Sequence, residues 1–132
     1  MDAGDRRASV GVLRYHEELK LNVEVDPEIA RFARALVPKS VPLRRPRYAP
    51  HITVVRNEAV PKPDLWGRHE GVFVPFDYEP FVLNDEVYFW LRVYSPLLTQ
   101  VRLELGLAES SEWSRAPDGA ETFHLTIGNL KP

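Results

Sequence analysis

The sequence predicts an α+β domain assembled from two similar halves. The 132-residue chain carries the pattern His-apolar-Thr-apolar twice, at residues 51–54 and 124–127. Each copy follows the same series of segments, namely a strand, a proline-capped helix and an irregular loop. No Gly/Ser linker or low-complexity run divides the chain. We therefore expect one domain over residues 1–132, with internally duplicated lobes at about 1–70 and 71–132.

The first half contains a strand, a helix and a loop before its motif. Residues 19–25 alternate between apolar and polar side chains, which is typical of a strand. Asp26 and Pro27 then supply an N-cap and a first-turn proline. Pro38 is expected to end the helix, whose apolar side chains recur at helical spacing: Ile29, Phe32, Ala33, Leu36 and Val37. A loop rich in proline and arginine leads to the strand that begins at about residue 49 or 50.

The second half repeats this order. Residues 87–94 are rich in aromatic and β-branched side chains and predict a strand. Ser95 and Pro96 form the cap of the next helix, and Gly106 marks its end, while four apolar residues define the helix: Leu97, Leu98, Val101 and Leu105. A polar loop over residues 108–121 precedes the strand with the second motif.

The strand over residues 87–94 has two different faces. One is apolar and is expected in the core: Val87, Phe89, Leu91 and Val93. The other is amphipathic and could stack on a nucleobase or pack, and for Trp90 we favour packing: Tyr88, Trp90, Arg92 and Tyr94. Between the halves, residues 72–83 predict one or two further strands. Pro75 and Pro80 interrupt them and favour sheet edges or bulges.

Composition narrows the classes of function. Hydrophobic residues make up 44% and charged residues 27% of the chain, which is ordinary for a folded protein, and no segment resembles a membrane span or a leader. A cytoplasmic location is therefore expected. The formal net charge of −2 argues against binding to long nucleic acids, and the lack of cysteine excludes disulfides and thiolate chemistry. Positive charge is local, since no acidic residue lies between Lys39 and Arg56, a stretch that contains Arg44, Arg45 and Arg47.

The paired motifs carry the chemistry. In a strand, residues i and i+2 share a face, so His51 lies beside Thr53 and His124 beside Thr126. Two such strands side by side would bring two imidazoles and two hydroxyls to one cleft. Imidazole has an ordinary pKa near 6.5, so one ring can act as base and the other as acid, while hydroxyls donate to phosphate oxygens. This set of side chains suits the cleavage of a phosphodiester.

The chain resembles the 2H phosphoesterase superfamily through these two motifs. Further segments resemble small phage members that degrade the cyclic oligonucleotide messengers of bacterial anti-phage (CBASS) immunity: residues 48–58, 65–67, 84–91, 104–107 and 123–127. The resemblance implies antiparallel sheets around a central groove, with helices outside. It also implies a metal-independent hydrolase that cleaves 3′,5′-phosphodiester bonds of cyclic di- or trinucleotides in the cytoplasm of an infected host, as a form of immune evasion.

We therefore expect four catalytic residues: His51, Thr53, His124 and Thr126. The motif leaves open which histidine is the base, and whether a 2′-OH or water attacks. Candidate substrate-binding residues are Tyr15, Arg47, Tyr48, Arg56 and Trp66. Alternation places Arg56 on the face opposite Thr53 unless a bulge or the strand end re-aims it. His16 and His69 lack a threonine partner and are expected at the surface. No cofactor is expected, because Glu58, Asp85 and Glu86 have no metal-ligand spacing with any histidine.

Two alternatives stay open. The first is a 2′,3′-cyclic phosphodiesterase that acts on RNA ends or tRNA-splicing products, for which a basic track should lead away from the histidines. The second is a module that binds and sequesters cyclic nucleotides without catalysis. An enzyme for small messengers should instead show a pocket, and the negative net charge favours it. The expected partner is a small-molecule substrate, with neither a membrane nor a long nucleic acid, and the oligomeric state is open.

Overall fold

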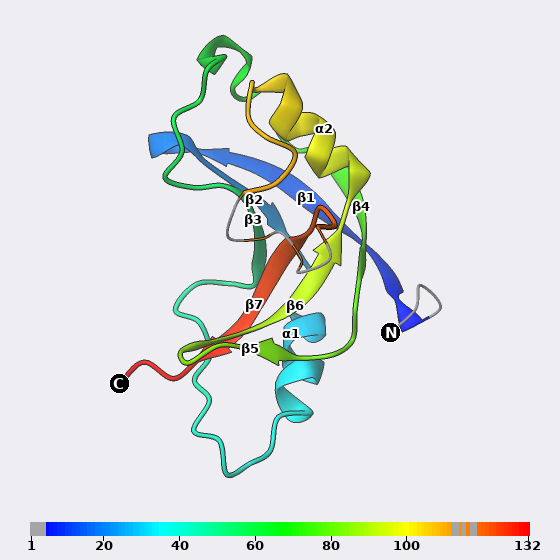
Figure 1. Cartoon of the computed structure of the whole chain (residues 1–132), viewed down its shortest axis with the longest axis vertical. Helices are drawn as coiled ribbons and strands as arrows, with labels where there is room; N and C mark the ends of the chain where they lie inside the picture. Colours follow the sequence, from blue (N-terminus) through cyan, green and yellow to red (C-terminus); the bar gives the residue numbers. More distant parts are fainter. Residues whose placement is uncertain (1–4, 112–113, 115, 117–118) are drawn as a thin grey trace.

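A closed antiparallel sheet with two helices forms the fold (Figure 1). It is seen in a computed structural model that describes residues 5–111, 114, 116 and 119–132. The strands of the closed sheet are β1 (Arg7–His16), β2 (Lys20–Glu24), β3 (His51–Val55), β4 (Phe73–Tyr78), β6 (Tyr88–Tyr94) and β7 (Phe123–Asn129). The helices are α1 (Pro27–Ala35) and α2 (Pro96–Glu104). The expected α+β class is confirmed.

The sheet closes because β4 pairs on both of its sides. The strand order is β4-β1-β2-β3-β7-β6, and a further pairing between β4 and β6 completes the ring. The short strand β5 (Leu83–Asn84) extends from β6. All these pairings are antiparallel. The described residues therefore form one barrel-like sheet shared by both halves of the chain, whereas separate sheets in two lobes were expected.

The caps of both helices form as the sequence predicts. The Asp26 carboxylate accepts a hydrogen bond from the Glu28 amide at 3.0 Å, and the Ser95 hydroxyl accepts one from the Leu98 amide at 3.4 Å. Gly106 follows α2 with φ 84°, the left-handed conformation that favours glycine at a helix end. These interactions are local in sequence, which is why the pattern of cap, proline and apolar spacing could predict them.

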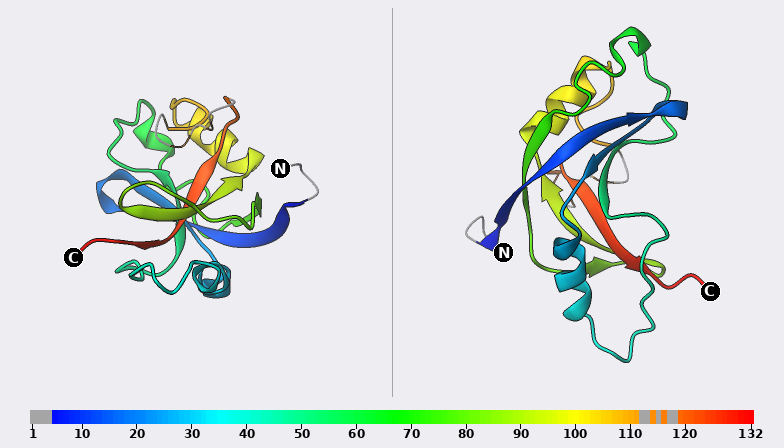
Figure 2. Two further views of the ribbon diagram at one scale, coloured as in Figure 1. Left: turned by 60° about the horizontal axis from the view of Figure 1, so that its bottom comes forward. Right: turned by 180° about the vertical axis from the view of Figure 1, so that it is seen from behind.

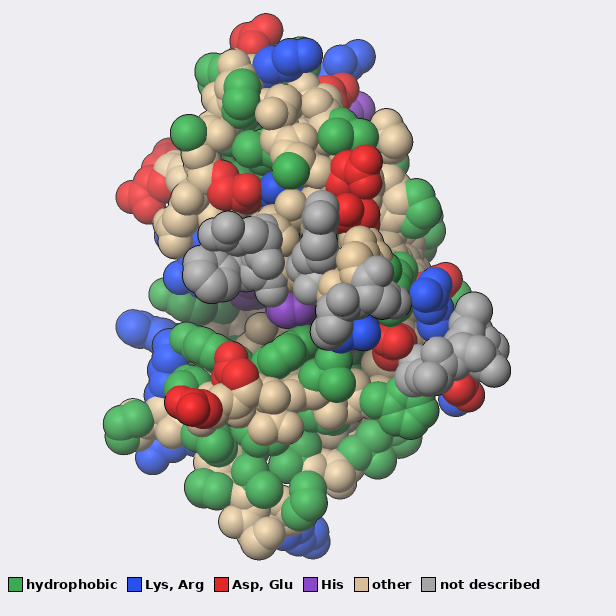
Figure 3. Space-filling view, viewed as in Figure 1, with side chains coloured by type: hydrophobic (Ala, Val, Ile, Leu, Met, Phe, Trp, Pro, Cys, Tyr) green, Lys and Arg blue, Asp and Glu red, His purple; other side chains and the backbone are tan. Residues whose placement is uncertain are grey.

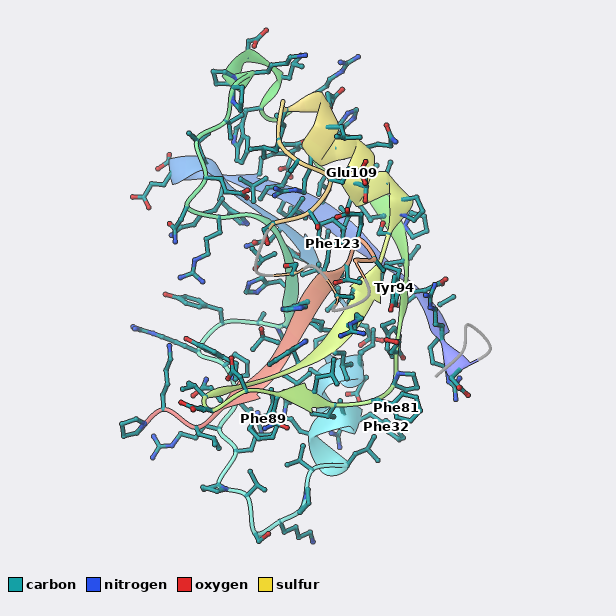
Figure 4. All side chains as sticks on the ribbon, viewed as in Figure 1. Phe32, Phe81, Phe89, Tyr94, Glu109 and Phe123 are labelled. Carbon is teal, nitrogen blue, oxygen red and sulfur yellow. The ribbon has the colours of Figure 1, made fainter. Side chains whose placement is uncertain are left out.

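The helices cover opposite ends of the closed sheet, α1 at the bottom and α2 at the top in both Figure 1 and the left view of Figure 2. α1 contributes the small side chains of Ala30 and Ala33 to the core. Phe32, labelled in Figure 4, and Leu36 belong to the apolar spacing of this helix, but they are 69% and 56% exposed. α1 thus meets the sheet through its alanines, and these two larger side chains lie at the edge of the contact.

One contiguous core fills the described part of the molecule. It includes the inward residues of the central strands β3, β6 and β7: Ile52, Val54, Phe89, Leu91, Val93, Phe123, Leu125 and Ile127. The apolar face expected for residues 87–94 is thus confirmed from Phe89 to Val93. No helix among the described residues is long and apolar enough to cross a lipid bilayer. The opposite face of the central strands carries the polar side chains.

Candidate functional site

The two His-x-Thr motifs lie on neighbouring hydrogen-bonded strands. β3 and β7 are antiparallel with Ile52 opposite Leu125, and both of these side chains are fully buried. Side chains alternate across a strand, so the other face must carry the remaining members of both motifs: His51, Thr53, His124 and Thr126. The same register sets each histidine across from the threonine of the other motif. The two motifs therefore occupy one face in a head-to-tail arrangement.

The flanking strands extend this face in both directions. On the β2 side, Asn22 lies opposite Thr53, and Glu24 lies opposite His51. On the β6 side, Trp90 lies opposite Thr126, and Arg92 lies opposite His124. The sequence predicted the amphipathic face of β6 but not the part played by Asn22 and Glu24. The alternation of residues 20–24 places Asn22 and Glu24 on one face of their strand, but only the pairing of β2 with β3 shows that this is the face of the motif residues.

A cleft of about 830 Å³ opens over three of the four motif residues, Thr53, His124 and Thr126. Trp90 and Tyr88 line it on the β6 side, and Ser110, Ser111 and Ser114 line it from the loop after α2. Figure 3 shows histidine side chains near the middle of the view. His51 is half-buried at the start of β3 on the same face, but it does not line this cleft.

The His51 ring is held in one orientation by the backbone. Its Nδ1 lies 3.0 Å from the carbonyl oxygen of Ala49. A carbonyl can only accept, so Nδ1 must carry the proton that forms this hydrogen bond. The other ring nitrogen, Nε2, is then the one that can exchange a proton with a ligand. A hydrogen bond of this kind fixes both the tautomer and the ring direction.

His124 sits in a different environment. Its ring stacks on the indole of Trp90, with 5.0 Å between centroids and 26° between planes. Burial, together with the positive charge of Arg92, lowers the pKa of His124 from 6.5 to about 4. Both causes disfavour the charged form, so His124 is a neutral imidazole at pH 7. A neutral imidazole can accept a proton from an attacking hydroxyl.

Arg56 reaches the cleft because β3 contains a bulge. The pairing of β2 with β3 shifts so that Leu21 lies opposite Val55 while Asn22 lies opposite Thr53. The extra residue in β3 leaves both Val54 and Val55 buried, and the next side chain returns to the face of Thr53. Arg56 accordingly lines the cleft. This is the exception to alternation that the sequence left open.

The remaining candidate binding residues lie elsewhere. Tyr15 lies opposite the buried Leu21, so it is on the core side of β1, and its ring meets Trp66 edge to face with 5.1 Å between centroids. Neither aromatic ring lines the cleft. Tyr48 is 70% exposed, and the guanidinium of Arg47 lies 5.9 Å from its ring centroid. None of these four residues is among those that line the cleft.

An ion pair that the sequence did not predict supports one wall of the cleft. Arg102 is 1% exposed and makes two hydrogen bonds of 2.8 Å to the carboxylate of Glu58. It also donates to the carbonyl oxygens of Val54 at 2.7 Å and Ala108 at 2.8 Å. Arg102 thereby joins β3 to the loop after α2. The sequence signal was a charged residue four positions after Leu98, on the apolar stripe of the helix.

The basic loop before β3 is attached to the end of β7. Arg44 and Asn129 exchange two backbone hydrogen bonds of 2.9 Å each. Gly128 permits this contact, because a Cβ there would lie 2.8 Å from the Arg44 carbonyl oxygen. Beside it, the amine of Lys131 lies 4.9 Å from the ring centroid of Tyr88, which lines the cleft. The positive side chain of Lys131 therefore lies next to one rim of the cleft.

The other two histidines are outside this face. His16 is exposed at the end of β1, whereas the half-buried His69 forms a 2.8 Å contact with Glu104 through Nε2. Glu104 also binds Arg68 at 2.9 Å, so this group is a surface ion cluster near α2. Among the described residues, no group of three or more His, Cys, Asp or Glu side chains could hold a metal ion.

Comparison of the chain with protein-family models, with curated proteins and with solved structures gives no match, so the chemistry of the site must be derived from its own residues. These residues supply a neutral imidazole, a second imidazole of fixed tautomer, two hydroxyls and a nearby arginine. Such a set can transfer protons and bind an anion.

Proposed function

We propose that this protein is a metal-independent phosphodiesterase of the 2H type, which cleaves 3′,5′-linkages of cyclic di- or trinucleotides. The observation that carries the proposal is the pairing of Ile52 with Leu125, which places both His-x-Thr motifs on one face. The proposed biological role is the removal of nucleotide messengers of bacterial immunity during phage infection, in the host cytoplasm. It follows from the resemblance of the motifs and their flanking segments.

The two histidines can divide the proton transfers. His124 is neutral at pH 7 and is proposed as the base that takes the proton of the 2′-OH. The 2′-oxygen bonds to phosphorus, the P–O5′ bond breaks, and the leaving oxygen takes a proton from the Nε2 of His51. The product is a 2′,3′-cyclic phosphate. Hydrolysis by water would reverse the two roles, with His51 as base and His124 as acid.

The threonines and Arg56 are proposed to bind the charge on the phosphate. Thr53 and Thr126 each lie beside a histidine on this face and can donate hydrogen bonds to non-bridging oxygens. Arg56 adds a positive charge from the same cleft. Neutral donors and one cation suit a group whose negative charge increases on the equatorial oxygens in the transition state.

The symmetry of the strand order supports this assignment. The ring contains β1, β2 and β3 from the first half and β4, β6 and β7 from the second half. Exchange of β1 with β4, of β2 with β6 and of β3 with β7 reproduces the same strand order. The same exchange matches α1, between β2 and β3, with α2, between β6 and β7. We propose that the halves are duplicated lobes related by this pseudo-two-fold, which makes His51 and His124 equivalent.

The size and lining of the cleft favour a small nucleotide. Its volume of about 830 Å³ is within the range of small-molecule sites. Tyr88 and Trp90 offer aromatic surfaces near the motif residues, and nucleobases stack on such surfaces. A cyclic dinucleotide would place a phosphate at the histidines and bases on these rings.

One observation favours the second candidate, a 2′,3′-cyclic phosphodiesterase that acts on RNA ends. The loop with Arg44, Arg45 and Arg47 is attached to the end of β7, and Lys131 lies over Tyr88. An RNA strand that left the cleft past Tyr88 would meet this positive charge. Cleavage of such a substrate should then weaken steeply with added salt, in contrast to cleavage of a cyclic dinucleotide.

The test is turnover in EDTA of a panel of cyclic di- and trinucleotides, 2′,3′-cyclic mononucleotides and short RNAs that end in a 2′,3′-cyclic phosphate. We expect the wild type to cleave cyclic oligonucleotides, and His51→Ala and His124→Ala each to lose activity by at least about a thousandfold. His16→Ala is the matched control because His16 is exposed and outside the cleft. Turnover that needs a metal ion, or that survives loss of both motif histidines, would exclude the mechanism. Tight binding without product would support sequestration instead.

A further inference from the structure

Arg92 is a charged residue on the site face to which the mechanism above gives no role. It lies directly opposite His124 in the pairing of β6 with β7, on the side of His124 away from β3. Its side chain is half-buried, and its charge is close enough to contribute to the lowered pKa of His124. An arginine so close to an imidazole opposes protonation of that ring.

The guanidinium of Arg92 has an unused hydrogen-bonding group. Its Nε is buried and has no hydrogen-bond partner in the described part of the chain, and the same holds for the buried indole Nε1 of Trp90 on this face. The nearest carboxylate along the strand pairing, that of Glu79, accepts a hydrogen bond from the hydroxyl of Tyr94 and makes no ion pair with Arg92 in the described part of the chain. Buried donors without partners cost free energy, so a ligand that accepts from them is favoured.

Other arginines near the sheet are satisfied by carboxylates. Arg14 binds Glu24 and Glu70, Arg68 binds Glu104, and Arg102 binds Glu58. Those contacts explain these three residues as parts of the fold. Arg92 is different because no carboxylate of the described residues forms an ion pair with it, while His124 lies opposite it and Trp90 stacks on that histidine. An anionic ligand would fill this place.

We propose that Arg92, with the indole N–H of Trp90, binds a second phosphate of the substrate, one nucleotide away from the phosphate that is cleaved. The inference rests on the proposed function. The reacting phosphate lies between the two histidines, and Arg92 is one strand beyond His124, about 4.8 Å further across the sheet. Arg92 is not among the residues that line the cleft over Thr53, His124 and Thr126, so a phosphate that it binds lies beside that cleft, where a mononucleotide does not extend. The preferred substrate class is thus a nucleotide with at least two phosphodiesters.

Trp90 has a positioning role in the same arrangement. Its ring stacks on His124, so an anion held by its N–H and by Arg92 lies against the edge of the catalytic imidazole. Negative charge at that place offsets the charge of Arg92. When the second phosphate is bound, protonation of His124 therefore becomes easier during the reaction. Binding of a two-phosphate substrate should prepare His124 to hold the proton that it accepts.

The experiment compares Arg92→Met with wild type on two substrates, a 3′,3′-cyclic dinucleotide and a 2′,3′-cyclic mononucleotide. We expect KM for the cyclic dinucleotide to rise about 10- to 100-fold, the effect of one lost charge-assisted contact, with little change in kcat. Kinetics on the mononucleotide should change less than about threefold. Arg92→Lys should recover part of the loss. Arg31→Met is the control, because Arg31 is exposed on α1 and binds only Glu28 among the described residues.

The outcomes separate this inference from the proposed function. An equal fall of kcat on both substrates would assign Arg92 to the cleaved phosphate. Unchanged kinetics on both substrates would show that Arg92 binds no part of the substrate. Either result overturns the inference and leaves the proposed phosphodiesterase activity intact. If the wild type cleaves neither substrate, calorimetry with a phosphorothioate-linked cyclic dinucleotide replaces kinetics. Loss of about 10-fold or more in affinity in Arg92→Met would then support the phosphate site, and equal affinity would overturn it. Thermal unfolding of each variant controls for folding.

Discussion

The environment of His124 makes a specific prediction about acid. The pKa of His124 is about 4 in the folded protein and near 6.5 in an unfolded chain, so the unfolded state binds the proton more tightly. The contribution of His124 to stability is complete above pH 6.5 and is lost as the pH falls toward 4. The lowered pKa has two causes: burial is the larger, and the positive charge of Arg92 is the second, and both disfavour a charged ring.

The size of this effect follows from the shift. Each pKa unit corresponds to about 1.4 kcal/mol, and pH 5 lies about 1.5 below the ordinary pKa of 6.5, so protonation of the unfolded state at pH 5 lowers the free energy of unfolding by at most about 2 kcal/mol. The ring is half-buried rather than enclosed, so solvent screening reduces the figure to about 1 kcal/mol. The free energy of unfolding of wild type should thus fall by about 1 kcal/mol more between pH 7.5 and pH 5 than that of His124→Gln.

Urea denaturation at both pH values measures this difference directly, with each protein compared with its own value at pH 7.5. His16→Gln serves as the control and should behave like wild type, because His16 is exposed. NMR titration of the imidazole C–H signals gives the pKa of His124 independently. An ordinary pKa for His124, or the same pH dependence in wild type and His124→Gln, would refute the reasoning.

Three further predictions concern the support of the site. Arg102→Ala removes a buried cation with its four hydrogen bonds and leaves the carboxylate of Glu58 without its ion-pair partner. The free energy of unfolding should therefore fall by about 3–5 kcal/mol in urea titrations. A loss below about 1 kcal/mol would mean that the pair is not held as described. Gly128→Ala places a Cβ against Leu43 and the Arg44 carbonyl oxygen, which should weaken the two backbone hydrogen bonds between Arg44 and Asn129. Hydrogen exchange at these two amides should then become faster, and unchanged exchange would contradict the contact. Trp90→Leu removes the stacked ring, so the pKa of His124 should rise toward its ordinary value in NMR titration, and a pKa that stayed near 4 would show that other groups bury the ring.

The sequence predicted those features that depend on local geometry. The caps at Asp26 and Ser95 need only neighbours within a few residues, and both formed as expected. The alternation of each motif likewise separates the buried Ile52 and Leu125 from the histidines and threonines without knowledge of the partner strand. Local patterns were therefore sufficient for both helices, for the strands other than β1, whose bounds were not predicted, and for the face on which the motif residues lie.

Features that depend on long-range pairing were beyond the sequence. Arg102 meets a carboxylate 44 positions away, and nothing near either residue indicates that contact. The bulge that turns Arg56 into the cleft arises from the register between β2 and β3. The exposure of Phe32 follows from where α1 lies against the sheet, which helical spacing alone cannot specify. Closure of the sheet through β4 is of the same kind, because it joins the two halves of the chain.

The most direct test of the central proposal, that the two motif histidines serve one reaction, is a double-mutant comparison of single-turnover rates in EDTA. Rates on a cyclic dinucleotide would be measured for wild type, His51→Ala, His124→Ala and the double variant. If the two imidazoles act together across one phosphate, either single change should abolish most of the acceleration, and the double variant should be little slower than the slower single variant. Losses that multiply, or a single variant that keeps near wild-type rates, would contradict a shared reaction centre on β3 and β7.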